Sequence, residues 1–364
     1  MKKIYNFNAG PSMLPKAVLL RVKKELLNWN KLGASVMEIS HRSIDFINLT
    51  DKIKRNLKKL LNIPNSYKIL FAPGGARGQF SAIPMNITRK LDTVDYIVGG
   101  HWSNEAYIEA KKFCLPNKIN VRENFFGKEY ITHFNKWKLS KNSKYVHYCP
   151  NETIEGIEIL NNPIGNNFAN KIIIGDFSST ILSKPINVKE YGIIYASVQK
   201  NIGPPGITLI IIKKSILYSK RKDIPSILDY KNLLNYDSMF NTPATFSWYV
   251  SGLVIKWLIK KGGIDFASKL NYKKSKLLYN FIDKSDFYNN NIHYNNRSTL
   301  NVIFNIYNTN LNNLFLKESR DAGLIALKGH NLIGGMRASI YNSMPIRGVR
   351  KLIKFMKYFE KKYG

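Results

Sequence analysis

Cysteine and acidic residues are scarce in this chain of 364 residues, and no long apolar run is present in it. The two cysteines, Cys114 and Cys149, are too few for a disulfide framework or a cysteine-based metal cluster. The longest apolar runs, such as ITLIII at 207–212, are much shorter than a membrane span. The first residues, MKKIYNFNAGP, lack the apolar core of a signal peptide. We therefore expect a cytoplasmic protein without a bound metal or a membrane partner.

The shortage of acidic residues leaves a formal net charge of +32, from 56 Lys and Arg against 24 Asp and Glu. A charge of this size can indicate a polyanionic partner such as nucleic acid. The lysines are scattered along the whole chain, however, and Asn, Ile, Tyr and Lys are abundant together, as an AT-rich genome would produce. We interpret the charge as compositional drift without a specific nucleic-acid partner. A positive field would still attract an acidic small substrate.

Short apolar, β-branched segments alternate with helical ones over the first two thirds of the chain. Such runs, bounded by turns and interleaved with helices, predict an α/β fold with a mainly parallel sheet covered by helices on both faces. The predicted strands are 67–72, 95–99, 145–149, 171–176, 192–198 and 207–212.

The pattern changes after Phe246, where a long apolar helix leads into a second helix rich in Lys and Tyr. Two further strands, at 300–306 and around MRASI, and a closing helix from Ile346 predict a smaller α+β domain. The Asn-rich stretch at 285–297 is expected to be a surface loop. The predicted organisation is an extended N-terminal segment (1–15), a large domain (16–260) and a small C-terminal domain (261–364).

Two charged residues end apolar strands. The run YGIIYASVQKNIGPPG brings Lys200 into a turn rich in Gly and Pro. Burying an ammonium is costly, and a desolvated amine that loses its proton easily attacks an aldehyde to form a Schiff base. Asp176 ends the run KIIIGD, and sites in parallel sheets lie beyond the carboxyl ends of the strands. Asp176 is either a turn former or the partner of a pyridinium nitrogen, which it would keep protonated.

The Gly-rich segment APGGARGQF (72–80) follows a predicted strand and opens a helix. Glycines let the backbone approach an anion, and the N-terminus of a helix offers free N–H groups. Gly75, Ala76 and Arg77 are therefore candidates for holding a phosphate. The segment matches neither GxGxxG nor the loop that ends in Gly-Lys-Ser/Thr, so an ordinary strand-to-helix turn is the alternative.

Four other residues each have a cofactor role and a structural alternative. Trp102 follows GGH at the end of a predicted strand, and its indole either stacks on a planar cofactor or packs in the core. Thr153 in HYCPNETIEG either donates a hydrogen bond to a ring oxygen or belongs to a turn. Asn241 and Thr242 in MFNTPATF are either phosphate ligands or the cap of the next helix.

The candidate anion-binding side chains come from three segments. A lone arginine usually lies on the surface and a lone histidine is often structural. Arg337 differs, because it lies in an otherwise apolar strand, which suggests bidentate carboxylate binding. The candidates are His41 and Arg42 in EISHRS, His330 in LKGHN and Arg337 in GGMRAS.

Together, these segments resemble the phosphoserine aminotransferase family of class V pyridoxal-phosphate-dependent aminotransferases. The resemblance covers nearly the whole chain, and its motifs come in the family's order. The matching stretches are NFNAGPSMLP, VMEISHRS, FAPGGARGQFSAIPMN, HYCPNETIEG, DFSSTILSKPI, YASVQKNIGPPG, SMFNTPATFSWY and LKGHNLIGGMRASIYNSMP.

The resemblance implies a fold-type-I large domain and a homodimer with active sites at the subunit interface. It implies that Lys200 forms the Schiff base with pyridoxal 5'-phosphate and that Asp176 pairs with the pyridine nitrogen. Trp102 would stack on the ring, and Thr153 would bond its phenolic oxygen. The cofactor phosphate would be held by Ala76, Arg77 and Gln199 of one subunit and Asn241 and Thr242 of the other.

For the substrates, the resemblance implies that Arg337 binds the α-carboxylate. His41 and Arg42 of the neighbouring subunit, together with His330, would face the phosphate of phosphoserine or the distal carboxylate of glutamate. One residue departs from the family pattern, since Asn331 follows the histidine where an arginine is common. This departure leaves the strength of phosphate recognition open.

The implied reaction moves an amino group from L-glutamate to 3-phosphohydroxypyruvate, giving 2-oxoglutarate and O-phospho-L-serine in serine biosynthesis. The family also allows a phosphorylated threonine-like substrate of vitamin B6 synthesis. Rival activities within class V are alanine–glyoxylate aminotransferase and cysteine desulfurase. A desulfurase needs a reactive cysteine on an exposed loop, which neither Cys114 nor Cys149 is expected to supply.

Overall fold

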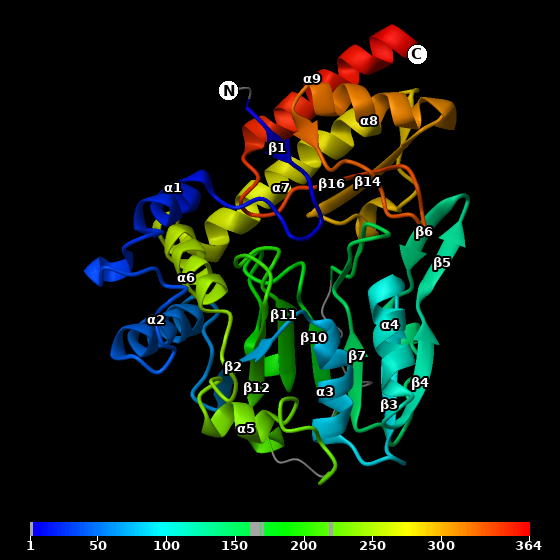
Figure 1. The fold of residues 1–364 in the computed structure, drawn as a ribbon. Coiled ribbons are helices and arrows are strands. Elements are labelled where there is room, and N and C mark those ends of the chain that lie inside the picture. The colour runs from blue at the N-terminus through cyan, green and yellow to red at the C-terminus, as the bar shows by residue number, and fades with distance from the viewer. Residues whose placement is uncertain (1–2, 161–167, 169–170, 218–220) are drawn as a thin grey trace.

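The computed structural model describes residues 3–160, 168, 171–217 and 221–364, and a seven-stranded sheet lies at its centre (Figure 1). All neighbouring strands run parallel except around β12, which is antiparallel to both β2 and β11. The predicted α/β class with a mainly parallel sheet is confirmed. In spatial order the strands are β2 (Tyr67–Pro73), β12 (Ile207–Lys213), β11 (Ile193–Ser197), β10 (Ile172–Asp176), β7 (Tyr145–Tyr148), β3 (Thr93–Val98) and β4 (Leu115–Asn120).

The six strands predicted in this part of the chain all belong to the sheet, but its seventh strand, β4, was not predicted. The sequence of β4, LPNKIN, has a proline and three polar residues, and the strand lies at the sheet edge beside β3. Edge strands tolerate such residues because one side of their backbone has no neighbour. The hairpin of β5 (Arg122–Phe125) and β6 (Lys128–Ile131) was also missed, because its side chains are mostly exposed and show no apolar alternation.

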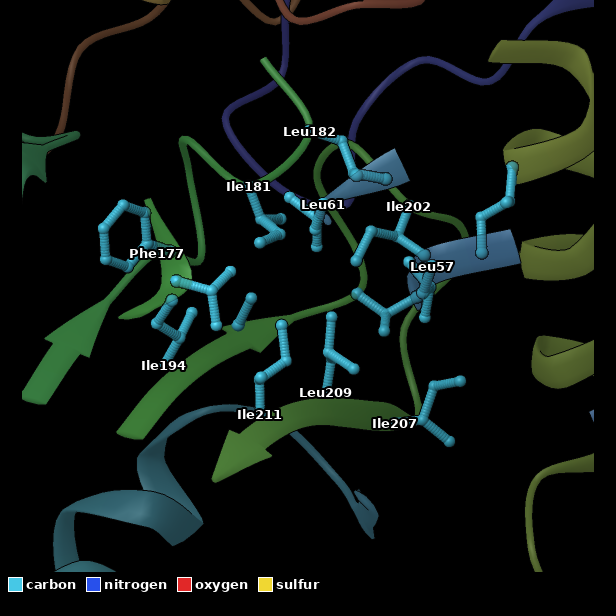
Figure 2. Packing of buried hydrophobic residues seen from close by; sticks show 14 of the residues in the cluster. Leu57, Leu61, Phe177, Ile181, Leu182, Ile194, Ile202, Ile207, Leu209 and Ile211 are labelled. Atoms are coloured by element: carbon cyan, nitrogen blue, oxygen red, sulfur yellow. The ribbon is translucent and has the colours of Figure 1, made fainter. Parts of the chain in front are cut away.

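Helices cover both faces of the sheet, and two hydrophobic clusters fill the space beneath them. One cluster includes residues of α3 (Arg77–Ile87) and α4 (His101–Ala110). The other includes residues of α1 (Lys16–Glu25), α2 (Ile44–Leu60) and α6 (Thr245–Lys260). Figure 2 shows how Leu57 of α2 and Leu61 pack toward strand residues such as Leu209. Burying each such side chain contributes about 1.5–3 kcal/mol.

The C-terminal part has a separate hydrophobic cluster, which lies above the central sheet in Figure 1. It combines the sheet β13–β14–β16 with three helices and with β15. Tyr5 and Phe7 belong to the same cluster, and β1 pairs in parallel with β15, so the N-terminal segment packs against this part. The elements are β1 (Tyr5–Asn6), α7 (Gly263–Ile282), β13 (Tyr288–Asn289), β14 (Asn301–Ile306), α8 (Asn312–Asp321), β15 (Leu324–Ile325), β16 (Met336–Ser339) and α9 (Ile346–Tyr363).

The stretch 285–297 is not a simple surface loop, so that prediction was wrong. It contains β13 and a 3-10 turn at Tyr294–Asn296, and Tyr288 and Ile292 are buried. The buried Asn290 side chain donates to the Ile303 carbonyl at 2.7 Å, so it joins the stretch to β14. Asn-rich composition predicted solvent exposure, but amides also satisfy buried backbone groups.

Other short elements are α5 (Tyr230–Asn235) and the pair β8 (Asn151–Glu152) and β9 (Ile157–Glu158). Among the helices in the described residues, none combines the length and apolarity that crossing a membrane requires.

Candidate active site

A pocket of about 470 Å³ lies where β10 and β11 end, within the size range of small-molecule sites. It contains the predicted residues Lys200, Asp176 and Trp102 together with the Gly-rich turn after β2. The sheet brings these residues together because the carboxyl ends of parallel strands lie at one edge. Its lining also includes Gln199 and four polar residues that were not predicted: Asn151, Ser178, Ser179 and Ser197.

Lys200 follows β11 by three residues and is half-buried in the pocket wall. The N-terminal segment holds its turn in place. The Ser12 backbone N–H donates to the Gln199 carbonyl at 2.9 Å, and the Ser12 hydroxyl donates to the Lys200 carbonyl. A Cβ on Gly10 would lie 3.6 Å from Lys200 Cγ, so this glycine packs directly beside the lysine. The role of the N-terminal segment is a long-range contact that no local pattern announced.

Asp176 is the last residue of β10 and is 5% exposed. Burial raises the pKa of its carboxyl, and hydrogen bonds from Ser178 and the charge of Lys200 oppose that rise. The Ser178 backbone N–H donates to Asp176 Oδ1 at 2.9 Å. The site therefore holds an acid deep in the pocket and supplies donors that favour its ionised form.

The turn that opens α3 presents unused backbone donors. In the part of the chain that the structure describes, the N–H groups of Gly75, Ala76 and Arg77 have no protein acceptor. The Arg77 side chain is occupied elsewhere, since it forms an ion pair with Glu105 at 3.0 Å and lies 5.3 Å over the Trp102 ring. An anion here would be bound by backbone N–H groups at a helix N-terminus.

Trp102 and Thr153 are joined directly. The indole Nε1–H donates to Thr153 Oγ1 at 3.0 Å, which leaves the proton of the threonine hydroxyl free to donate to a ligand. The Arg337 guanidinium reaches the same place from β16 and donates from Nη1 to the Thr153 carbonyl at 3.1 Å. Arg337 thus contacts the residue that binds the Trp102 indole, although the strand that carries it belongs to the C-terminal sheet.

Two histidines accompany Arg337. The His330 ring lies 5.9 Å from the His101 ring, and the His101 ring lies 5.2 Å from the Trp102 ring. Burial lowers the pKa of His330, and the charges of Arg337 and His101 lower it further. A bound anion would offset this repulsion, so the group is suited to a negatively charged ligand. His101 was not singled out from the sequence.

A buried carboxylate pair behind Trp102 was also missed. Glu152 accepts from the backbone N–H groups of Trp102 and Ser103, at 3.0 and 2.9 Å, and Glu155 accepts from that of His101 at 2.8 Å. Burial and the neighbouring Glu155 raise the pKa of Glu152 to about 7. The pair binds the first turn of α4 and so fixes the position of the indole. The motif NETIEG shows the two acids, but not that they face free N–H groups at the start of a helix 50 and 54 residues earlier in the chain.

Seven predicted residues are not among those that line the pocket. Thr153, Arg337 and His330 are connected to the lining residue Trp102 through the contacts described above, and four others lie in two separate turns. His41 and Arg42 lie in the turn before α2, and Asn241 and Thr242 lie in the loop before α6, and none of the four is among the lining residues. The Asn241 side chain donates to the Thr242 carbonyl at 3.2 Å. Their assignment to a site shared with a second subunit stays a prediction.

Both cysteines are buried, and burial raises the pKa of each thiol, of Cys114 to about 11. Neither is the exposed, readily ionised cysteine that a desulfurase requires. Among the described residues, no group of three or more His, Cys, Asp or Glu side chains could hold a metal ion.

Comparison with known proteins agrees with this geometry. The model of the class V aminotransferase family matches residues 4–352, so the chain belongs to that family and is an aminotransferase. A phosphoserine aminotransferase of Buchnera aphidicola subsp. Schizaphis graminum is 59% identical over 364 residues, which is all of both chains. The chain therefore belongs, within class V, to the phosphoserine aminotransferases.

Solved structures give the same result. A phosphoserine aminotransferase whose Schiff base was studied for radiation damage is 40% identical, with a TM-score of 0.94 and complete coverage of both chains. A phosphoserine aminotransferase of Trichomonas vaginalis with bound PLP is 35% identical, with a TM-score of 0.91. That match covers 98% of this chain and all of the other.

Proposed function

We propose that this protein transfers the amino group of L-glutamate to 3-phosphohydroxypyruvate with pyridoxal 5'-phosphate as its cofactor. The products are 2-oxoglutarate and O-phospho-L-serine. The observation that carries the proposal is one pocket that holds a lysine, a buried aspartate and a helix N-terminus with unused N–H groups. These three features fit an aldehyde, a ring nitrogen and a phosphate of the same small molecule.

The residues present fit this cofactor. Lys200 would hold it covalently through Nζ, Asp176 would accept a hydrogen bond from the ring nitrogen, and the Trp102 indole would cover one ring face. Thr153 Oγ1 retains a proton for the phenolic oxygen, since it only accepts from Trp102. The phosphate would be held by the N–H groups of Ala76 and Arg77, by Gln199 and, from a second subunit, by Asn241 and Thr242.

When bound, the cofactor withdraws electrons from the substrate's α-carbon, which makes the α-proton acidic. The chain's own part is to place a base there. Lys200 Nζ would act as the general base that takes the α-proton of the substrate and as the acid that gives the proton back to complete the transfer. Asp176 would keep the ring nitrogen protonated throughout. The Ser12 contacts with the Lys200 turn hold the amine within reach.

Substrate recognition is proposed to use two anion subsites. Arg337 would bind the α-carboxylate, since its guanidinium is anchored on the carbonyl of Thr153, the residue that accepts from the Trp102 indole. His330 would face the distal phosphate or carboxylate, joined by His41 and Arg42 of a second subunit. Asn331 adds no cation to this subsite, so recognition of the distal group depends on those three residues.

We further propose a homodimer. His41 and Arg42 are flanked by side chains that are apolar and exposed in the single chain: Met37 at 57%, Ile44 at 68% and Ile47 at 41%. Exposed apolar side chains that gather in one segment support a protein interface. The same segment would then bring His41 and Arg42 to the partner's pocket. The separate hydrophobic clusters support our proposed division of the chain into a large domain (16–260) and a small domain (261–364). We also propose that the protein is located in the cytoplasm.

The proposal is tested by incubating the protein with pyridoxal 5'-phosphate, L-glutamate and 3-phosphohydroxypyruvate and following the phosphorus NMR signal. Formation of O-phosphoserine that requires both glutamate and the cofactor is the expected result. The rivals are tested in parallel with alanine plus glyoxylate and with cysteine. Faster amino transfer to glyoxylate, or release of sulfide from cysteine, would contradict the proposed substrates.

A further inference from the structure

A row of polar side chains runs across one face of the central sheet behind the pocket. Asp176 of β10 is in register with Tyr195 of β11, so their side chains lie side by side on the same face. His147 of β7 is in register with Ile174, two residues before Asp176, and therefore points to that face as well. Tyr96 of β3, in register with His147, completes the row.

The members of this row are in contact and are almost fully enclosed. His147 Nε2 lies 2.8 Å from the Tyr195 hydroxyl, and Tyr195 is the cross-strand neighbour of Asp176, whose charge acts on the Tyr195 phenol. The Tyr96 ring stacks on the His147 ring at 4.8 Å. Exposures are 2% for His147 and zero for Tyr195. The row therefore runs from the interior to the acid that faces the pocket.

The protons in this row have one favourable arrangement. His147 Nδ1 is buried and, in the described part of the chain, has no hydrogen-bond partner. A proton on Nδ1 would be a buried donor without an acceptor, which costs more than an unused lone pair. With the proton on Nε2 instead, His147 donates to the Tyr195 oxygen. The Tyr195 hydroxyl then keeps its only proton for another acceptor, and the carboxylate of its cross-strand neighbour Asp176 lies on the same face.

Burial keeps the row from changing charge. It lowers the pKa of His147 to about 3, so the imidazole is neutral at neutral pH. It raises the pKa of Tyr195 well above the ordinary value, so the phenol keeps its proton. The other titratable groups facing Asp176 are Lys200, whose charge favours the carboxylate, and Cys149, whose thiol stays protonated.

We propose that His147 and Tyr195 are positioning residues that fix Asp176 as an oriented, ionised carboxylate for the ring nitrogen of the cofactor. His147 orients the Tyr195 hydroxyl, and Tyr195 supplies Asp176 with a hydrogen bond that is lost if the acid takes up a proton. The inference rests on the proposed function, because that function gives Asp176 its ligand. It assigns a role to two buried residues that do not line the pocket.

The first test reads the proton directly. The complete protein with pyridoxal 5'-phosphate is labelled with 15N-histidine, and the signal of His147, one of six histidines, is identified by its loss in His147→Gln. We expect a neutral ring with its proton on Nε2 between pH 6 and 8. A proton on Nδ1, or a charged ring, would overturn the inference and would leave the proposed amino transfer standing.

The second test compares variants by the affinity for the cofactor, followed by quenching of tryptophan fluorescence. Tyr195→Phe should bind the cofactor roughly tenfold more weakly, because loss of a hydrogen bond to a charged group is worth about that much. His147→Leu should weaken binding in the same direction. His147→Gln should largely restore it, because its amide N–H can take the place of the Nε2–H.

The matched control is Tyr148→Phe. Tyr148 is the neighbour of His147 on β7 but points to the opposite face, where its hydroxyl pairs with that of Tyr191 at 2.6 Å. Removing it costs a buried hydrogen bond without touching Asp176. Equal loss of cofactor affinity in Tyr148→Phe and Tyr195→Phe, with both variants folded by circular dichroism, would show a general packing effect and overturn the inference. Absence of amino transfer in the unmodified protein would instead contradict the proposed function.

Discussion

The surroundings of Lys200 and Asp176 differ sharply from those of the turn that carries His41 and Arg42. The first two residues lie at the ends of buried strands, and hydrogen bonds from Ser12 and Ser178 fix their positions. The turn lies on the surface beside exposed apolar side chains. The difference supports our proposal that one chain supplies Lys200 and Asp176, whereas a second chain completes the distal-anion subsite with His41 and Arg42.

Removing the central amine should have the largest effect. Lys200→Ala should lower kcat at least roughly a thousandfold, since it removes both the covalent anchor and the general base. Steady-state assays with glutamate and 3-phosphohydroxypyruvate measure this, and equilibrium binding should show that the cofactor is still held without a covalent bond. Lys213→Ala, at the exposed end of β12, is the control. Substantial turnover by Lys200→Ala would show that the catalytic centre is not in this pocket.

Mixing two inactive variants tests the division between chains. In a shared site, Lys200→Ala and Arg42→Ala subunits form mixed dimers in which one site has both native residues. After unfolding and refolding an equimolar mixture, we expect about a quarter of the activity of the unmodified protein, from random pairing of the two chains. No recovery, with mixed dimers verified by native mass spectrometry, would place Arg42 in the pocket of its own chain, and full activity of Arg42→Ala alone would place it outside the site.

Loss of the arginine that is proposed to bind the α-carboxylate should reduce activity less. Arg337→Ala should raise KM for glutamate and phosphoserine roughly 10- to 100-fold, because a hydrogen-bonded charge pair is worth about 1.5–3 kcal/mol. Initial rates over a range of each substrate measure the change. Arg350→Ala, an exposed arginine on α9, should leave KM unchanged. An unaltered KM for both substrates in Arg337→Ala would argue against its role.

The packing around Gly100, behind Trp102, should not tolerate a larger side chain. A Cβ on Gly100 would lie 2.5 Å from Glu152 Cγ and 2.6 Å from Glu155 Oε2. Gly100→Ala should therefore lower the free energy of unfolding by about 1–3 kcal/mol. Gly78→Ala in the first turn of α3 is the control, since its added methyl group meets nothing within 4 Å. Denaturant unfolding of both variants makes the comparison, and equal stabilities would mean that the carboxylate pair is not rigid.

The smallest expected effect is a change in how stability depends on pH, caused by Glu152. Glu152 has a pKa of about 7 in the folded chain against an ordinary 4.5, so between these values the folded state binds more protons than the unfolded state. Its contribution to stability is therefore lost as pH rises from 4.5 through 7. Glu152→Gln should flatten this decline relative to the exposed control Glu123→Gln. Urea unfolding from pH 5 to 8 measures it, and parallel curves for the two variants would contradict the raised pKa.

The local sequence pattern was enough to predict site residues that have reactive side chains and lie at the ends of apolar strands. Lys200 and Asp176 could be predicted to meet, because each ends an apolar strand of a parallel sheet. The edge strand β4 could not, since it lacks an apolar pattern, and the buried residues of 285–297 were hidden by their Asn-rich context. Contacts such as Ser12 with Lys200 join residues 188 positions apart, which no local signal predicts.

The central claim is that phosphoserine reacts at Lys200, and one spectrum tests it most directly. The purified protein is saturated with pyridoxal 5'-phosphate, and the visible absorption band of the lysine-bound cofactor is followed while O-phosphoserine is added. We predict that the band disappears and that the ultraviolet band of the aminated cofactor replaces it. A band that ignores phosphoserine but responds to alanine or cysteine would contradict the proposed substrate, and absence of any visible band would contradict the role of Lys200.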